Sequence, residues 1–215
     1  MPTSTPFTII KAPTRGAVTD LLKTQEPKPK VEIKGIAPFD TIEWQKPAWE
    51  STASVLLLSG AAGSGKSRLA HEKIHALMMR FPESTGIIVR KTRSSLTNSS
   101  VLMMNSQVIG GDPQVTHRPS KNRWEYANGS VLLYSGMATP EDSEKIRSAG
   151  LKGGIDFALL EEATQMTQKD YQEIRSRMRG NSGTFRQVIL CTNPGGPTHW
   201  IYNDLIIPHD NGHLE

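Results

Sequence analysis

The chain has 215 residues, 36% of them hydrophobic and 21% charged, a composition typical of globular proteins and unlike disordered or membrane proteins. This length suits one main domain, and no apolar run approaches a membrane span or the core of a signal peptide. A formal net charge of +4 permits contact with a polyanion without requiring it, and the single cysteine, Cys191, excludes an intramolecular disulfide framework and agrees with a reducing cytosol.

Residues 1–38 are predicted to be a flexible leader, because prolines recur along them and apolar periodicity is weak. The folded domain is expected over residues 39–215. In that part, short apolar runs alternate with helical patterns. Strands are predicted at Val55–Ser59, Gly86–Arg90, Ser130–Tyr134, Phe157–Leu160 and Gln187–Cys191, and helices at Lys66–Arg80 and Gln168–Arg179. This order predicts an α/β fold with a mainly parallel central sheet flanked by helices. Asn128-Gly129 predicts a hairpin turn, and thus an inserted antiparallel pair.

A phosphate-binding loop is predicted between the first strand and the first helix. The pattern G-x-x-x-x-G-K-[ST] is matched at every fixed position by Gly60, Ala61, Ala62, Gly63, Ser64, Gly65, Lys66 and Ser67. Glycines allow backbone N–H groups to curl around a phosphate, and the helix N-terminus adds a positive end. Lys66 would place its charge on the β- and γ-phosphates, and Ser67 would offer its hydroxyl to Mg²⁺. The alternative is a glycine-rich turn that only joins strand to helix, and the match at all fixed positions between a strand and a helix disfavours it.

Two acids end the strand predicted at Phe157–Leu160. Glu161 would hold Mg²⁺, and Glu162 would orient or deprotonate the water that attacks the γ-phosphate. The first acid of such a pair is usually Asp, so Glu161 is a departure from the pattern. Both acids also suit the start of a helix, which is the structural alternative. Taken with the phosphate loop, the pair predicts a P-loop NTPase of the ASCE type.

Thr192 and Asn193 follow the last predicted strand and would sense the γ-phosphate or the attacking water. The local alternative is a strand exit that ends in Asn193-Pro194.

The helix after the phosphate loop also contains H-E-x-x-H, formed by His71, Glu72 and His75. On a helix this spacing places two histidines one turn apart, as in zinc proteases. Because the longer phosphate-loop pattern already explains the position of this helix, we interpret both histidines as residues of its polar face. A zinc metalloprotease therefore stays an alternative hypothesis, as does a helicase-like ATPase.

Over roughly Asp40 to Ile207 the chain resembles the large terminase subunits of phages. The matching pieces are Trp44-Gln45, Ile88 to Thr92, Tyr134 to Gly136 and the run from Asn193 to Tyr202. The resemblance implies ATP as the nucleotide, with Gln45 reading the adenine edge. It also implies translocation of double-stranded viral DNA into a procapsid by a homo-oligomeric ring, with a portal protein and a small terminase subunit as partners, in the host cytoplasm and without a membrane.

The resemblance further implies an arginine that completes the site of a neighbouring subunit. Arg147 is the preferred candidate by position, with Arg93 and Arg123 as rivals. Because the chain ends at Glu215, where family members continue into a nuclease domain, we expect no nuclease activity from it. Contacts with DNA phosphates could come from basic residues in two places, namely Arg90, Lys91 and Arg93 after the second strand, and Arg175, Arg177 and Arg179, which also suit a helix C-terminus.

Overall fold

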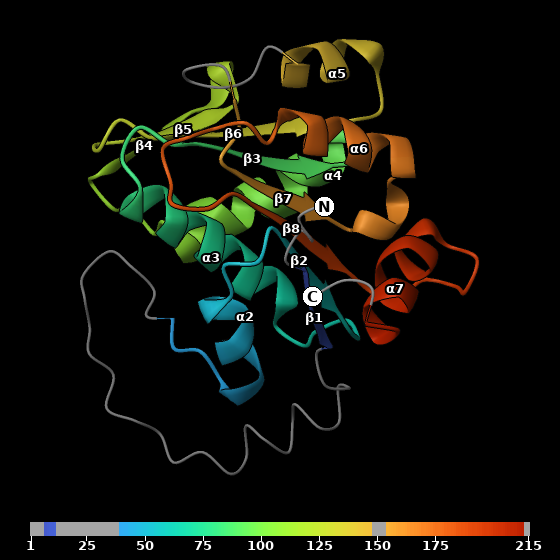
Figure 1. The fold of residues 1–215 in the computed structure, drawn as a ribbon. Coiled ribbons are helices and arrows are strands. Elements are labelled where there is room, and N and C mark those ends of the chain that lie inside the picture. The colour runs from blue at the N-terminus through green and yellow to red at the C-terminus, as the bar shows by residue number, and fades with distance from the viewer. Residues whose placement is uncertain (1–6, 12–38, 148–153, 213–215) are drawn as a thin grey trace.

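An eight-stranded sheet forms the centre of the molecule in the computed structural model, which describes residues 7–11, 39–147 and 154–212 (Figure 1). The strand order is β1-β2-β8-β7-β3-β6-β5-β4. The strands are β1 (Phe7–Lys11), β2 (Val55–Ser59), β3 (Thr85–Arg90), β4 (Val115–Arg118), β5 (Arg123–Tyr126), β6 (Val131–Gly136), β7 (Phe157–Glu161) and β8 (Gln187–Thr192). Neighbours from β1 to β6 run parallel, and β5 pairs antiparallel with both β6 and β4. The predicted α/β class with a mainly parallel sheet is confirmed.

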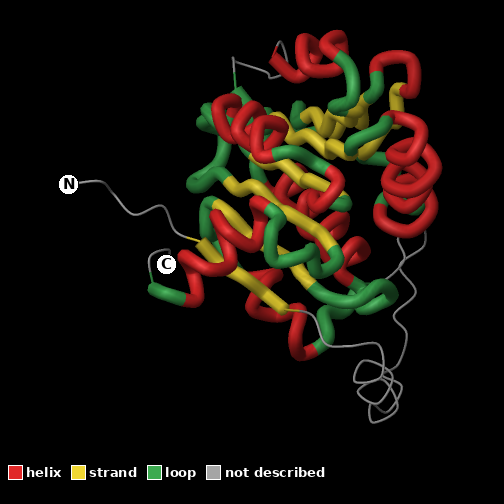
Figure 2. Tube along the Cα trace, turned by 90° about the vertical axis from the view of Figure 1, so that its right-hand side faces the viewer, coloured by secondary structure: helices red, strands yellow, loops and turns green. Residues whose placement is uncertain are grey.

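Helices flank the sheet on both sides (Figure 2). The α-helices are α2 (Lys46–Glu50), α3 (Lys66–Arg80), α4 (Arg93–Leu96), α5 (Pro140–Arg147), α6 (Gln168–Arg177) and α7 (Ile207–Asp210). Tighter 3₁₀ turns form η1 (Glu43–Gln45), η4 (Pro119–Lys121) and η6 (Ala163–Gln165), and wider π-helical turns form η2 (Thr97–Val101), η3 (Met104–Val108) and η7 (Tyr202–Ile206). Within the described ranges, no helix combines the length and apolarity needed to cross a bilayer.

Side chains along each buried strand point alternately to the two faces of the sheet, and they form two layers of the core. On β2, Leu56 and Leu58 face the layer that α2, α3 and η3 cover, whereas Val55 and Leu57 face the layer under α5, α6 and η7. Successive side chains of a strand point to opposite faces, so a strand covered on both faces is apolar throughout. This explains why β2, β7 and β8 appear in the sequence as continuous apolar runs.

The N-terminal segment corrects part of the predicted leader. Residues 7–11 form β1, which pairs in parallel with β2 from Phe7 opposite Val55 to Lys11 opposite Ser59. The remaining residues of the predicted leader lie outside the described part of the chain. The proline-based prediction missed β1 because a five-residue strand carries little pattern of its own, and its pairing partner lies far along the chain.

The predicted hairpin turn at Asn128-Gly129 is confirmed and joins β5 to β6. Gly129 has φ +85°, a conformation that glycine adopts at little cost. The Asn128 side chain donates hydrogen bonds to the carbonyl oxygens of Met78 and Met79 at 2.9 and 3.0 Å. These carbonyls lie in the last turn of α3, so the turn also satisfies the end of the helix that follows the phosphate loop.

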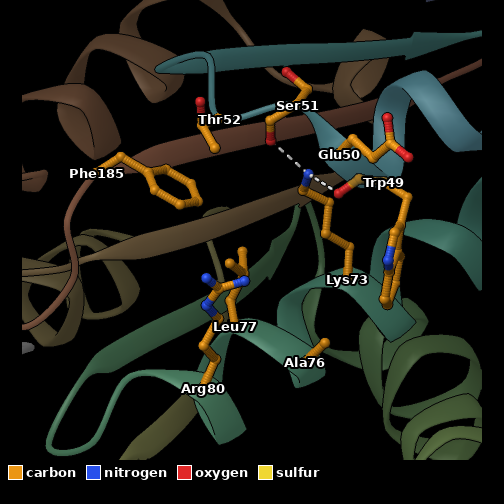
Figure 3. Close-up of a pocket in the computed structure, with 9 residues that line it drawn as sticks. All are labelled: Trp49, Glu50, Ser51, Thr52, Lys73, Ala76, Leu77, Arg80 and Phe185. Atoms are coloured by element: carbon orange, nitrogen blue, oxygen red, sulfur yellow. Dashed lines mark hydrogen bonds between the residues drawn. The ribbon is translucent and has the colours of Figure 1, made fainter.

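The side chain of Lys73 connects α3 to the short helix α2. Its ammonium donates to the carbonyl oxygens of Ala48, Trp49 and Ser51 at 2.7, 2.8 and 2.7 Å, beside a hollow of about 320 Å³ (Figure 3). Burial lowers the pKa of Lys73 to about 8. These bonds satisfy orphan carbonyls at the end of α2 and hold α2 against α3.

Candidate nucleotide-binding site

Three strand ends form one edge where the predicted site residues meet. β8 lies between β2 and β7, with Ser59 paired to Thr192 and Glu161 paired to Cys191. The carboxyl ends of parallel strands share one edge of a sheet, so the loop after β2 lies beside the end of β8 and near the two acids. The sheet topology thus brings together residues that lie more than 90 positions apart in the sequence. The spacing of residues within each motif does not predict that the motifs lie close together in space.

The phosphate loop has the backbone that its glycines predict. Gly63 and Gly65 have φ +76° and +88°, in the left-handed region that side chains disfavour. A Cβ on Gly65 would also lie 3.0 Å from Nε2 of Gln45, so this glycine is required by both conformation and space. The 15-residue helix α3 begins directly afterwards at Lys66, and its N-terminal N–H groups provide a positive end for an anion.

Lys66 lies folded over the loop and is 95% buried. Its ammonium donates to the carbonyl oxygens of Gly60 and Ala61 at 2.8 and 2.7 Å, and to the Ser64 hydroxyl at 3.1 Å. A longer contact of 3.4 Å joins it to Oδ1 of Asn193. Burial lowers the pKa of Lys66. The charge of Lys66 is thus held over the loop, where a phosphate would lie.

A cavity of about 400 Å³ lies over the loop and collects most of the predicted site residues. It is lined by Ala62, Gly63, Ser64, Gly65, Lys66, Ser67, Arg68, Met103, Glu162, Cys191, Thr192 and Asn193. Gln45 is buried behind the loop, where its Oε1 accepts a hydrogen bond from the Ile42 N–H at 3.2 Å. The structure therefore places Gln45 against Gly65, outside the set that lines the cavity.

The two acids at the end of β7 have different surroundings. Glu161 is buried and accepts hydrogen bonds from the Ser100 and Ser99 hydroxyls, the latter at 3.5 Å. Glu162 has φ +50° and its side chain is 41% exposed. The left-handed conformation turns the chain out of the strand, so that one acid stays in the core while its neighbour lines the cavity.

Arg90 contacts both acids and was missed as a site residue at the level of sequence. Its guanidinium lies 3.5 Å from Oε2 of Glu161 and also forms an ion pair with Oε1 of Glu162. The interpretation of Arg90 as a DNA contact is therefore wrong, because the side chain is only 11% exposed and pairs with both acids. The sequence offered one indication of this pairing, because Arg90 ends a buried strand. An unpaired charge in that position would be energetically costly.

Other basic residues that the sequence suggested as DNA contacts also have partners within the chain. Lys91 forms an ion pair with Asp170 at 2.8 Å, and Arg93 donates to the Asn122 side chain. Arg175 lies over the ring of Tyr171 at 5.9 Å in the last turn of α6, which ends at Arg177. These contacts explain the residues locally.

The end of β8 connects the loop to the segment after the acids. The Thr192 hydroxyl lies 3.0 Å from the Thr164 hydroxyl and 3.2 Å from the Thr164 N–H, just beyond Glu162. Asn193 is exposed and meets Lys66 through its Oδ1. Thr192 thus faces the acid side and Asn193 the phosphate side, which is the placement that a sensor of the γ-phosphate would need.

The groups near the loop fit a hard divalent cation. Ser67 offers a hydroxyl oxygen and Glu161 a carboxylate oxygen, the donors that Mg²⁺ prefers when water and substrate phosphates complete its shell. Cys191 lies 3.7 Å from the Ser67 hydroxyl, and burial raises the pKa of its thiol to about 12. A thiol that stays protonated is a poor ligand, so it does not compete with the oxygen donors.

The histidines of the H-E-x-x-H pattern do not lie on a polar face, contrary to our interpretation. His71 and His75 are both buried, with Nδ1 of His71 at 2.7 Å from the Ser67 carbonyl oxygen and Nδ1 of His75 at 3.0 Å from the Tyr126 hydroxyl. Glu72 pairs with Arg68 at 2.6 Å. Among the residues that the structure describes, no three His, Cys, Asp or Glu side chains gather to hold a metal ion.

We expect the purified protein to contain no stoichiometric zinc, because the three side chains of this pattern face separate partners. Elemental analysis of the purified chain is the direct measurement. About one zinc per chain, retained through dialysis against a chelator and lost in a His71→Asn, His75→Asn double variant, would contradict this expectation and favour the metalloprotease.

Arg147 is the last residue of α5, after Ile146, which is buried in the second core layer. Its side chain lies outside what the structure describes. The rival Arg93 bonds to Asn122, and the rival Arg123 forms an ion pair with Glu125. Both rivals are thus engaged within the chain.

A phosphate loop after β2, an acidic pair after β7 and an additional strand, β8, between them define a P-loop NTPase of the ASCE type. The chain belongs to the phage terminase large subunit family, whose profile matches residues 52–214. No curated protein sequence matches it.

Solved structures of large terminases share the fold at low identity. The large terminase of a thermophilic bacteriophage superposes with a TM-score of 0.63 at 15% identity, covering 79% of this chain and 43% of that one. That enzyme has also been solved with ADP and with ATP-γ-S. The ATPase domain of the Thermus phage P74-26 large terminase gives 0.57 at 18% identity, covering 77% and 69%. The bacteriophage HK97 large terminase gives 0.62 at 14% identity, covering 93% and 42%. The chain thus spans less than half the length of two of these relatives.

Proposed function

We propose that this chain hydrolyses ATP to drive double-stranded viral DNA into a procapsid. The observation that carries the proposal is the meeting of Lys66, Glu162 and Asn193 around one cavity at the carboxyl edge of the sheet. Family membership supplies the kind of work to which hydrolysis is coupled. The thermophilic phage relative, solved with ADP and with ATP-γ-S, supports an adenine nucleotide as the ligand.

Each side chain has a role that its surroundings favour. Lys66 places a positive charge on the β- and γ-phosphates, and the N–H groups at the start of α3 surround them. Ser67 and Glu161 hold Mg²⁺, which, when bound, neutralises charge that develops on the phosphate oxygens. Glu162, half exposed at the cavity, orients or deprotonates the attacking water. Thr192 and Asn193 sense the γ-phosphate. The role of Gln45 at the adenine edge rests on the family alone, since Gln45 lies outside the cavity lining.

The wider assembly is part of the same proposal. As a terminase motor the chain would act in a homo-oligomeric ring around duplex DNA, together with a portal protein and a small terminase subunit. Its place would be the host cytoplasm, docked on the procapsid during packaging. Such a motor must move DNA of any sequence, so its contacts would be with the phosphate backbone and would weaken with salt.

The test is ATP turnover measured with and without blunt duplex DNA, alongside strand separation of a fluorescently labelled duplex. We expect Mg²⁺-dependent turnover that duplex DNA stimulates, with no strand separation. Turnover coupled to strand separation would favour the helicase-like alternative. An absence of turnover under both conditions, from a protein that binds ATP-γ-S, would contradict the proposed hydrolysis.

We further propose that Arg147 acts in trans on the site of a neighbouring subunit. A guanidinium supplied by a neighbour stabilises charge on the transferring phosphoryl group and contributes roughly 10³-fold or more to the rate. Turnover per chain should therefore rise with protein concentration, and Arg147→Ala should abolish this rise while ATP-γ-S binding is retained. Turnover measured across a dilution series is the check, with Arg123→Ala as the matched arginine control.

Mixed subunits give the sharper result. Arg147→Ala chains keep their own acids, and Glu162→Gln chains keep their arginine, so each supplies what the other lacks. We expect a mixture to exceed the summed activity of the two variants. If it does not, under conditions where wild-type subunits assemble, the trans role of Arg147 is wrong.

A further inference from the structure

The carboxylate of Glu161 is bonded to a serine from the π-helical turn η2. The Ser100 hydroxyl donates a hydrogen bond to Oε2 of Glu161, although 61 positions separate the two residues. Both residues are buried, Ser100 with none of its surface exposed and Glu161 with 5%. A buried carboxylate without donors is costly, so this bond stabilises the charged form of the acid at the end of β7.

Ser99 lies next to Ser100 but has another acceptor for its hydrogen. Its hydroxyl is 2.8 Å from the carbonyl oxygen of Ser95 and 3.5 Å from Oε2 of Glu161. A hydroxyl has a single hydrogen to donate, and the shorter bond takes it. Ser100 is therefore the serine whose hydrogen goes to the acid.

The wide turn of η2 explains how two adjacent serines reach the same carboxylate. Successive side chains of an α-helix lie about 100° apart around its axis. A π-helical turn contains more residues, so the angle between neighbours is smaller. Such turns are rare and are found frequently at functional sites. In η2 the wider turn directs Ser99 and Ser100 together toward the end of β7.

Among the described residues, the contacts of the Glu161 carboxylate fall on one of its oxygens. Ser100, Ser99 and Nη1 of Arg90 all approach Oε2, the last two at 3.5 Å. Oε1 is thus the oxygen left for a cation. Glutamate has one more rotatable bond than aspartate, the usual acid in this position, so its carboxylate needs a fixed partner to keep one orientation.

Ser67, the other side chain proposed to hold Mg²⁺, reaches the same strand end. Glu161 pairs in the sheet with Cys191, whose Sγ lies 3.7 Å from the Ser67 hydroxyl. Glu161 and Ser67 are therefore both neighbours of Cys191. Carboxylates that ligate a metal are themselves hydrogen-bonded by surrounding groups, which fix the direction of the ligand oxygen. Ser100 is placed to do this for Glu161.

We propose that Ser100 is a positioning residue for Mg²⁺, because it holds Oε2 of Glu161 and so leaves Oε1 directed to the cation. The inference rests on the proposed function, since it concerns the same Mg²⁺ site. It also explains how a glutamate serves where an aspartate is usual. The extra methylene extends the carboxylate to a donor on η2, and this donor removes the freedom that the longer side chain adds.

The first test measures how much Mg²⁺ strengthens the binding of ATP-γ-S, and it needs no turnover. Calorimetric titrations with Mg²⁺ and with a chelator give two dissociation constants, whose ratio is the Mg²⁺ gain. Ser100→Ala should lower this gain about tenfold, as the loss of a partner behind a metal ligand does, with the affinity without Mg²⁺ unchanged. Ser106→Ala is the matched control with an unchanged gain, since this exposed serine of η3 donates to the Leu102 carbonyl oxygen at 2.7 Å.

Glu161→Asp completes a double-mutant cycle, because the shorter side chain withdraws the carboxylate from Ser100. In that background Ser100→Ala should change the Mg²⁺ gain by less than about twofold. Equal effects of Ser100→Ala in the two backgrounds, an unchanged gain in Ser100→Ala, or no gain in the wild-type chain would overturn the proposal. A bond that only stabilises the fold would lower the thermal unfolding midpoint and leave the gain unchanged. Ser100→Cys, a weak donor of similar size, should lower the gain in the same direction, and it replaces Ser100→Ala if that chain does not fold.

The second test reads the bond itself from the nucleotide-free chain. In protein labelled with ¹³C at the side-chain carboxyl carbon of glutamate, the Glu161 resonance is assigned by its loss in Glu161→Asp. This resonance should move in Ser100→Ala and keep its position in Ser106→Ala. A resonance that stays in place in Ser100→Ala would overturn the proposal. An absence of ATP turnover together with the expected Mg²⁺ and ¹³C results would instead count against the proposed function alone.

Discussion

Lys66→Ala is expected to reduce ATP turnover by roughly 10³-fold or more, which is the largest effect that we predict. Lys66 is held over the phosphate loop by the carbonyl oxygens of Gly60 and Ala61 and by Ser64. Among the side chains that line the cavity, the other cation is Arg68, which is paired with Glu72. Nothing in the lining is therefore placed to replace the charge that Lys66 brings to the β- and γ-phosphates.

The fold should survive this substitution, because the loop conformation depends on Gly63 and Gly65 and on α3. Circular dichroism and thermal unfolding check this, and Lys169→Ala, an exposed lysine on α6, is the matched control with unchanged turnover. Turnover close to wild type by a folded Lys66→Ala protein would remove the phosphate-loop assignment.

Glu162→Gln should lower turnover by about 10²-fold or more while ATP-γ-S still binds. The amide keeps the shape of the side chain and its contact with Gln165 but loses the proton acceptor. Glu162 lines the cavity with 41% of its side chain exposed, and Lys66 is the residue proposed to contact the phosphates, so the loss should fall on kcat. Single-turnover rates and a fluorescent nucleotide titration separate the two quantities.

Glu161→Gln should behave differently, with weaker Mg²⁺ dependence and weaker nucleotide affinity together. Glu161 is buried among Ser99, Ser100 and Arg90, and these contacts fix its carboxylate in place. Glu50→Gln, an exposed acid at the end of α2, provides the matched change without effect. If the two phenotypes are exchanged, the roles within the acid pair are assigned the wrong way round.

The sequence predicted the parts of the fold that local pattern determines. The helix at Lys66–Arg80 and the turn at Asn128-Gly129 were found because a phosphate loop, helical periodicity and turn chemistry each act over a few residues. The residues of the phosphate loop are predicted by the same local rule, and the structure gives Gly63 and Gly65 the positive φ angles that such a loop needs. For these elements the intrinsic preference and the tertiary structure agree.

Long-range pairing explains what the sequence did not predict. Arg90 meets Glu161 because β3 and β7 are neighbours in the sheet, although 71 positions separate the two residues. His71 and His75 looked like polar-face residues because a helical pattern does not reveal that π-helical turns and the β-hairpin cover that face. The roles assigned to Glu161, Glu162, Thr192 and Asn193 remain predictions that the variants above test.

Strand β1 has a consequence for how this domain is handled. It covers β2, the strand that leads into the phosphate loop, and so converts that strand from an edge into an interior position. A chain shortened to begin at residue 39, the boundary that prolines suggest, would leave the backbone groups of an apolar strand open to pairing with another molecule. Such a protein should form aggregates through intermolecular strand addition before any loss of nucleotide chemistry becomes measurable.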